Sequence, residues 1–237
     1  MAITAARDVR FQSASQRSPT NALNAVEAGA AEFTLHDLPP LPTPDRQTMR
    51  SQAASGCTVV LMLIAVLAGL PHSVGNNYGG PWEHGNFRLR QLGLVALYIE
   101  AFFAILCLLG IMWGDPGVLK RSPETCFPLP QNIAEKLRQK QSLAGLENVY
   151  EGQHVFCVRC CIWRPDSSPP LYRDTTHHCS TCQRCVADFD HHCGVFGRCI
   201  AGKGWQGNMG YFKGILMMMF FGLITCIGTV AATAGAL

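Results

Sequence analysis

Three apolar blocks alternate with polar segments along this chain of 237 residues. Residues 92–113 form an apolar run interrupted only by Glu100, and residues 56–70 and 215–237 are also strongly apolar. Because about 20 apolar residues span a bilayer, the pattern predicts transmembrane helices at about 56–71 and 92–113 and a third at 213–237. The first block is the shortest, and a buried helix is the alternative for it.

Glu100 interrupts the middle of the second block. A carboxylate inside a bilayer is costly and normally faces other helices or a polar cavity. We therefore expect Glu100 to be protonated and hydrogen-bonded to a neighbouring helix, and a functional role is the alternative.

The polar segments have distinct characters. Residues 1–55 are rich in Ala, Ser, Pro and Arg and predict a disordered tail, in which residues 38–44 favour extended backbone. Residues 114–150 are expected to form a linker that contains the sequence DPG at 115–117. Within it, residues 132–145 predict a short helix capped by Asn132, with Ile133, Leu137 and Ala144 on one face.

The distribution of Lys and Arg predicts the orientation of the chain. Residues 1–55 carry five of these side chains, residues 71–91 carry two and residues 114–214 carry twelve. The positive-inside rule then places residues 1–55 and 114–214 in the cytosol. The net charge of +3 is small and dispersed, so we expect no nucleic-acid partner.

The cysteines indicate a metal-binding domain at residues 151–212. Eight of the 12 cysteines fall between Cys157 and Cys199, mixed with histidines, and a reducing cytosol disfavours disulfides. Two tetrahedral zinc ions need eight ligands, and one histidine from each of the pairs 177/178 and 191/192 would complete two sets of three cysteines and one histidine. The six expected thiolates are Cys157, Cys160, Cys179, Cys182, Cys185 and Cys199.

This arithmetic leaves Cys161 and Cys193 without a metal. Cys193 follows Asp190 and His191, which are the residue types that activate a thiol: the imidazole takes the proton and the carboxylate orients the imidazole. If the stretch is extended, alternation puts His191 and Cys193 on one face and His192 on the metal side. A turn would change this assignment, and on spacing alone Cys193 is also an acceptable ligand of a purely structural zinc module.

These motifs together resemble the DHHC-type protein S-acyltransferases, or palmitoyltransferases. The matching residues are Cys157 and Cys160, Arg164-Pro165, residues 177–186, the DHHC tetrapeptide at 190–193, Cys199, and Asn208 with Phe212. The sequence DPG at 115–117, which follows the second expected span, also matches. The resemblance implies an α-helical multi-pass membrane protein, usually with four spans, and a small cytosolic zinc-binding cysteine-rich domain between the second and third. Three spans are expected in this sequence.

The resemblance also implies the role of each site residue. Cys193 would take a long-chain acyl group from an acyl-CoA such as palmitoyl-CoA and pass it to membrane-proximal cysteines of protein substrates. His191 would be its base, oriented by Asp190. The location would be an endomembrane, Golgi or endoplasmic reticulum, or the plasma membrane. The two structural zinc ions would be held by one set of Cys157, Cys160, His178 and Cys185, and by another of Cys179, Cys182, His192 and Cys199.

The sequence departs from the family pattern in that the gaps between Cys160 and His178 and between Cys199 and Asn208 are longer than usual. Two other departures concern the residues after the tetrapeptide and the end of the sequence. Gly194-Val195 follow the tetrapeptide where the family usually has Pro-Trp, and the sequence stops at Leu237 within the third expected span. The last of these departures leads to an alternative expectation, a catalytically inactive membrane-anchored zinc scaffold that lacks the fourth helix.

Overall fold

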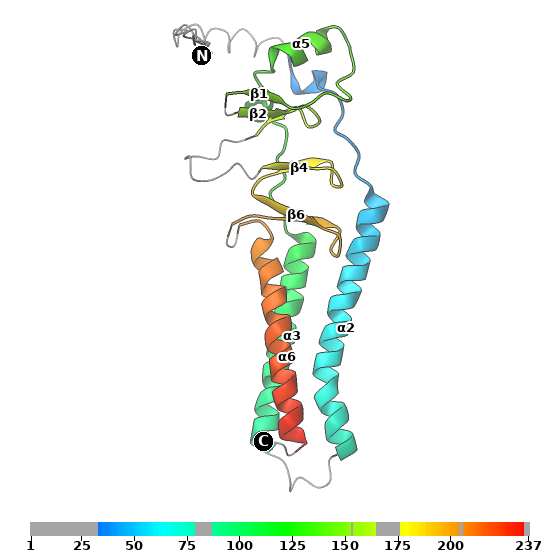
Figure 1. The fold of residues 1–237 in the computed structure, drawn as a ribbon, viewed down its shortest axis with the longest axis vertical. Coiled ribbons are helices and arrows are strands. Elements are labelled where there is room, and N and C mark those ends of the chain that lie inside the picture. The colour runs from blue at the N-terminus through cyan, green and yellow to red at the C-terminus, as the bar shows by residue number, and fades with distance from the viewer. Residues whose placement is uncertain (1–32, 79–86, 153, 165–175, 204–205, 235–237) are drawn as a thin grey trace, which may run out of the picture.

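The computed structural model of the chain describes residues 33–78, 87–152, 154–164, 176–203 and 206–234. Three long helices run alongside one another, and a set of short strands is stacked beyond one end of them (Figure 1). The helices are α2 (Arg46–Tyr78), α3 (Phe87–Trp113) and α6 (Met209–Thr233). All three are long and apolar enough to cross a membrane, which confirms the predicted multi-pass helical architecture.

Helix α2 begins ten residues before the predicted span and continues through Pro71. Asp45 explains the early start, because its carboxylate accepts hydrogen bonds from the backbone N–H and the hydroxyl of Thr48, at 3.0 and 2.6 Å. Such a side chain satisfies donors that the first turn of a helix otherwise leaves unpaired. The prediction of a disordered tail is therefore wrong for residues 46–55.

Small residues bring α3 and α6 close together. A side chain at Gly93 would collide with Thr229, one at Gly214 with Cys107. Small residues permit this approach between membrane helices, where packing rather than water exclusion drives association. Glu100 lies in the same contact and accepts a hydrogen bond from the hydroxyl of Thr225 at 2.9 Å, so the predicted hydrogen bond to a neighbouring helix is present.

The strands form three small antiparallel sheets between α3 and α6 in the sequence. The first sheet contains β1 (Val149–Glu151), β2 (His154–Cys157) and β3 (Ile162–Trp163). The second pairs β4 (His177–Cys179) with β5 (Arg184–Val186), and the third pairs β6 (Phe189–Cys193) with β7 (Arg198–Ala201). The β6–β7 sheet lies nearest the helices and the β1–β3 sheet farthest from them (Figure 1).

The segment before α2 packs against the outermost sheet. Leu38 is buried and follows the short 3-10 helix η1 (Leu35–Asp37). The carbonyl of Pro39 accepts a hydrogen bond from Arg121 Nη1 at 2.7 Å, and that of Pro42 from Arg184 Nη1 at 2.8 Å. Extended backbone leaves carbonyls open to such donors, so the disorder prediction is also wrong for residues 33–45. Residues 1–32 lie outside the described part of the chain.

The linker contains two short helices, α4 (Pro123–Cys126) and α5 (Gln131–Arg138). Helix α5 is shorter than the predicted helix at 132–145, and its cap is Pro130, whose carbonyl accepts from the N–H groups of Ile133 and Ala134. The predicted cap at Asn132 is wrong because Pro130 already has extended dihedrals and places Gln131 at the first helical position. Ile133 is fully buried, whereas Ala144 lies beyond the helix.

Arg198 connects the innermost sheet to the second span. Its guanidinium donates to the carbonyls of Ile111 and Gly114, at 2.8 and 3.2 Å. These carbonyls end α3, where the helix cannot pair them itself. The hydrogen bonds therefore fix β7, and with it the partner strand β6, to the end of α3.

Replacing Arg198 by methionine is expected to lower the free energy of unfolding by about 1–3 kcal/mol, since two carbonyls lose a charged donor. Thermal unfolding of the variant in detergent, followed by circular dichroism, measures this change. Arg159→Met is the matched control, because Arg159 is exposed. Equal midpoints for the two variants would contradict a role for Arg198 in stability.

Candidate active site and metal centres

The outer metal-binding group consists of Cys157, Cys160, His178 and Cys185, whose ligand atoms all lie within 4.8 Å of one another. The two sheets β1–β3 and β4–β5 meet here. Nδ1 of His178 faces the three sulfurs, at 3.6 Å from Cys157, 3.2 Å from Cys160 and 3.9 Å from Cys185. All four residues are buried.

The inner group consists of Cys179, Cys182, His192 and Cys199, within the same 4.8 Å limit. Nδ1 of His192 is 3.6, 3.4 and 3.9 Å from the respective sulfurs. The β4–β5 hairpin contributes to both groups, because alternate residues of a strand point to opposite sides. The structure thus brings together the same two sets of four residues that the resemblance implies, and each group can hold a metal ion.

The donor chemistry of both groups fits a soft divalent cation. In the outer group, hydrogen bonds with Cys160 and Cys185 lower the pKa of Cys157. The hydrogen bonds of Cys185 with Cys157 and Cys160 raise the pKa of Cys185. Three sulfurs so close together cannot all ionise unless a cation balances their charge. Three cysteines with one histidine are a ligand set typical of structural zinc.

Within the described residues, Cys161 and Cys193 belong to neither metal-binding group. The Cys161 thiol is buried and donates to the carbonyl of Val158 at 3.4 Å. Burial raises its pKa to about 11, so this thiol stays protonated at neutral pH. Cys193 is 8% exposed and packs in an apolar cluster with Ile111, Ile200 and Ile215. These come from α3, β7 and α6, and the Cys193 thiol therefore lies where the innermost sheet meets the membrane helices.

Strand β6 is extended across the DHHC tetrapeptide, as the sequence interpretation assumed. Opposite it on β7, His191 pairs with Ile200, His192 with Cys199 and Cys193 with Arg198. Because His192 faces the inner metal-binding group, the alternation of a strand directs His191 and Cys193 to the other face.

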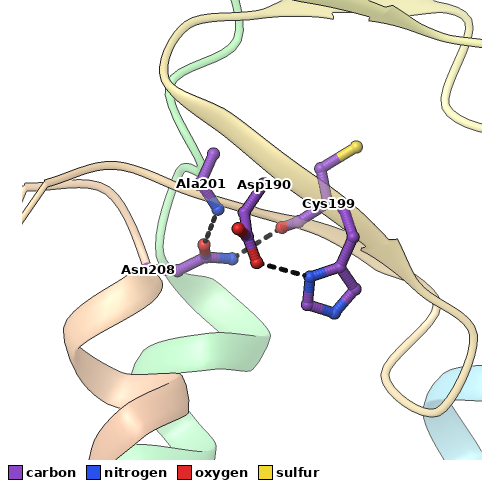
Figure 2. Close-up of polar contacts among 5 residues, drawn as sticks. Asp190, Cys199, Ala201 and Asn208 are labelled. Atoms are coloured by element: carbon purple, nitrogen blue, oxygen red, sulfur yellow. Dashed lines mark hydrogen bonds and ion pairs between the residues drawn. The ribbon is translucent and has the colours of Figure 1, made fainter. Parts of the chain in front are cut away.

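Asp190 holds the imidazole of His191. The Nδ1 atom of His191 is 2.8 Å from Oδ2 of Asp190 (Figure 2), and both side chains are partly exposed. The ring also makes an edge contact with Phe212, with centroids 5.5 Å apart. A carboxylate at Nδ1 favours the tautomer that carries its proton there, which leaves the lone pair on Nε2 to accept a proton.

The other histidine of the first pair has a different environment. His177 stacks on Phe189 with ring centroids 4.9 Å apart. It is not part of either metal-binding group, and burial lowers its pKa.

Asn208 fixes the strand opposite the tetrapeptide. Its side chain is fully buried, accepts from the N–H of Ala201 at 2.9 Å and donates to the carbonyl of Cys199 at 2.8 Å (Figure 2). Asn208 stands at the start of α6, so it joins β7 to the third span. The sequence interpretation noted Asn208 only as part of the family motif and assigned no role to Arg198, whose partners lie 84 and 87 residues away along the chain.

Two exposed aromatic residues lie at the helix ends beside this site. Trp113 at the end of α3 is 79% exposed, and Tyr211 in the first turn of α6 is also exposed. Trp and Tyr are enriched at the boundary between hydrocarbon and water. Cys193 packs in the same cluster as Ile111 and Ile215, which lie two and four residues from these aromatics, so the thiol is at the same end of the helices as Trp113 and Tyr211.

Comparisons with known proteins agree with the motif. Residues 150–236 match the family model described as DHHC palmitoyltransferase. The chain is 34% identical to "Palmitoyltransferase Hip14" of Drosophila melanogaster over 132 residues, which cover 56% of this chain and 17% of that protein. It is 30% identical to "Palmitoyltransferase ZDHHC17" of Mus musculus over 142 residues, which cover 59% of this chain and 18% of that protein.

The chain therefore spans less than a fifth of the length of these relatives. No solved structure matches it. The family match runs from residue 150, within β1, through α6 and includes both metal-binding groups and the DHHC tetrapeptide. Residues 150–236, which run from the cysteine-rich domain through the third membrane helix, are therefore similar to the DHHC palmitoyltransferases.

Proposed function

We propose that this chain is a protein S-acyltransferase that moves a long-chain acyl group, such as palmitoyl, from acyl-CoA to cysteine thiols of proteins. One observation carries the proposal. The Cys193 thiol is outside both metal-binding groups, on the face of β6 that also carries His191, and it packs among apolar residues at the end of the membrane helices. The names of the relatives support the same reaction.

In the first step the Cys193 thiol gives its proton to Nε2 of His191, and the sulfur attacks the thioester carbonyl of the acyl-CoA. The bond between that carbonyl and the CoA sulfur breaks, and the CoA thiolate takes the proton from the imidazolium. Asp190 keeps the imidazole in the required tautomer and stabilises its positive charge. The product is a thioester on Cys193.

In the second step the thiol of a protein substrate gives its proton to His191 and attacks the acyl group on Cys193. The thioester bond to Cys193 breaks, and the Cys193 thiolate recovers the proton. Both steps exchange one thioester for another, so no oxidant or reductant is needed.

The surroundings of Cys193 suit an amphipathic donor. Val60 of α2 and Leu108 of α3 extend the apolar cluster from Cys193 into the membrane helices, where an acyl chain would lie in hydrocarbon. CoA and the substrate thiol would then approach from the aqueous side, which we propose is the cytosol, at an endomembrane or the plasma membrane. The two metal-binding groups would hold structural zinc ions, whose binding supplies folding energy to the domain.

The direct test uses the purified chain and palmitoyl-CoA labelled in the acyl group. We expect a label on the protein that hydroxylamine removes, since hydroxylamine cleaves thioesters, and transfer of this label to a peptide that contains a cysteine. A peptide with serine in place of cysteine is the control. Absence of the label on the chain when both metal ions are bound would contradict the proposal.

Replacing His191 by alanine is expected to slow formation of the label about 10²–10⁴-fold, which is the usual contribution of a general base. His177→Ala is the matched control, because His177 stacks on Phe189 and has no role in the proposed steps. Initial rates of labelling measure both variants. Similar rates for the two would show that His191 is not the base.

A further inference from the structure

The N-terminal part of α2 contacts the turn between β6 and β7. This turn, residues 194–197, immediately follows the DHHC tetrapeptide. Gly197 has φ +61 and faces the backbone of Met49, and Gly56 faces the backbone carbonyl of Val195. A side chain at either glycine would collide with that backbone. The first turns of α2 and the turn after the tetrapeptide are therefore packed backbone against backbone.

Gln52 stands in the middle of this contact. Its Oε1 lies 3.5 Å from Nε2 of His192. Its Nε2 lies close to Gly194, at 3.7 Å from the position that a Cβ atom would take there. His192 directs its other nitrogen, Nδ1, at the three sulfurs of the inner metal-binding group. A histidine that binds a metal through Nδ1 carries its proton on Nε2, and this N–H needs an acceptor.

The two metal-binding groups differ in this respect. Nε2 of His178, in the outer group, is buried and has no hydrogen-bond partner among the described residues. Nε2 of His192 has one, and the acceptor comes from a membrane helix 140 positions earlier in the chain. Acceptors of this kind orient the ligand and raise its basicity, and their loss typically costs about 10–100-fold in metal affinity.

We infer that Gln52 is a positioning residue: its amide oxygen holds the His192 imidazole in the tautomer and orientation that bind the inner metal ion. Through this hydrogen bond the first span supports the strand that carries Cys193. The inference rests on the proposed zinc sites but not on acyl transfer. It assigns a role to a part of the chain that precedes the family match at 150–236.

The test measures zinc release from the purified full chain after addition of a chelating indicator. For Gln52→Leu we expect one of the two ions to leave about tenfold faster or more, while the other leaves at the wild-type rate. Gln52→Glu keeps an acceptor oxygen at this position and should restore slow release. Gln47→Leu is the matched control, because Gln47 is an exposed residue of the same helix.

The outcomes separate positioning from general stability. Faster release of both ions by Gln52→Leu would indicate a folding defect and overturn the inference, and so would superimposable traces for Gln52→Leu and Gln47→Leu. A wild-type chain that binds no zinc would overturn it as well. Hydroxylamine-sensitive labelling, measured on the same samples, reports separately on acyl transfer: wild-type zinc binding without label would contradict the proposed function alone.

Discussion

Replacement of Cys193 by alanine is expected to abolish the hydroxylamine-sensitive label while both zinc ions stay bound. Cys193 belongs to neither metal-binding group, so the change removes no metal ligand. The thiol is 8% exposed, and alanine leaves only a small void in the apolar cluster. Loss of label from the variant would therefore report the loss of the nucleophile rather than of the fold, and the rate should fall to the background of the uncatalysed reaction.

Two further cysteines make matched controls for this experiment. Cys57 contacts the same apolar cluster as Cys193, and Cys161 is buried beside the outer metal-binding group without belonging to it. Cys57→Ala and Cys161→Ala should retain the label. If Cys193→Ala carries as much label as these controls, the acyl group is on another residue and the proposed intermediate is wrong.

Removal of zinc is expected to unfold the strands while the membrane helices persist. In the described part of residues 149–201, the large fully buried side chains other than cysteines are Phe156, Ile162, Val186 and Ile200. A structural zinc site contributes about 10–16 kcal/mol in small domains. The total stability of a typical domain is only about 5–15 kcal/mol. Helices in a bilayer satisfy their own backbone hydrogen bonds, so α2, α3 and α6 should not depend on the metal.

Counting the cysteines that react with an alkylating agent measures this effect residue by residue. In the zinc-bound chain the six cysteine ligands should be protected, namely Cys157, Cys160, Cys179, Cys182, Cys185 and Cys199. After chelation these six should react, together with Cys161, and Cys226 within α6 should stay unreactive as the internal control. Protection of the six thiols after complete removal of zinc would contradict the account.

Local patterns were sufficient to predict the parts of the molecule that depend on neighbouring residues. The apolar runs predicted three membrane helices because burial in lipid needs only length and composition. The extended conformation assumed at 190–193 agrees with β6. The alternation of this strand puts His192 on one face and His191 and Cys193 on the other, as predicted. The division of the ligands into two sets needed the family resemblance, since spacing alone left both histidine pairs ambiguous.

Contacts between distant residues account for what the sequence did not predict. The order of residues 33–45 depends on Arg121 and Arg184, which reach the carbonyls of Pro39 and Pro42 from 82 and 142 positions away. No local pattern marks such pairs, and a segment rich in proline is typical of disorder when it is considered alone. The same reason applies to the contact of Gln52 with His192.

The central claim is that one thiol, Cys193, is free of metal and accepts the acyl group. Native mass spectrometry of the chain after incubation with palmitoyl-CoA tests it most directly, because zinc ions and acyl groups are counted on the same molecule. We predict two zinc ions and one acyl group on the wild-type chain, and two zinc ions without an acyl group on Cys193→Ala. A variant that keeps the acyl group, or that loses a zinc ion with it, would contradict the claim.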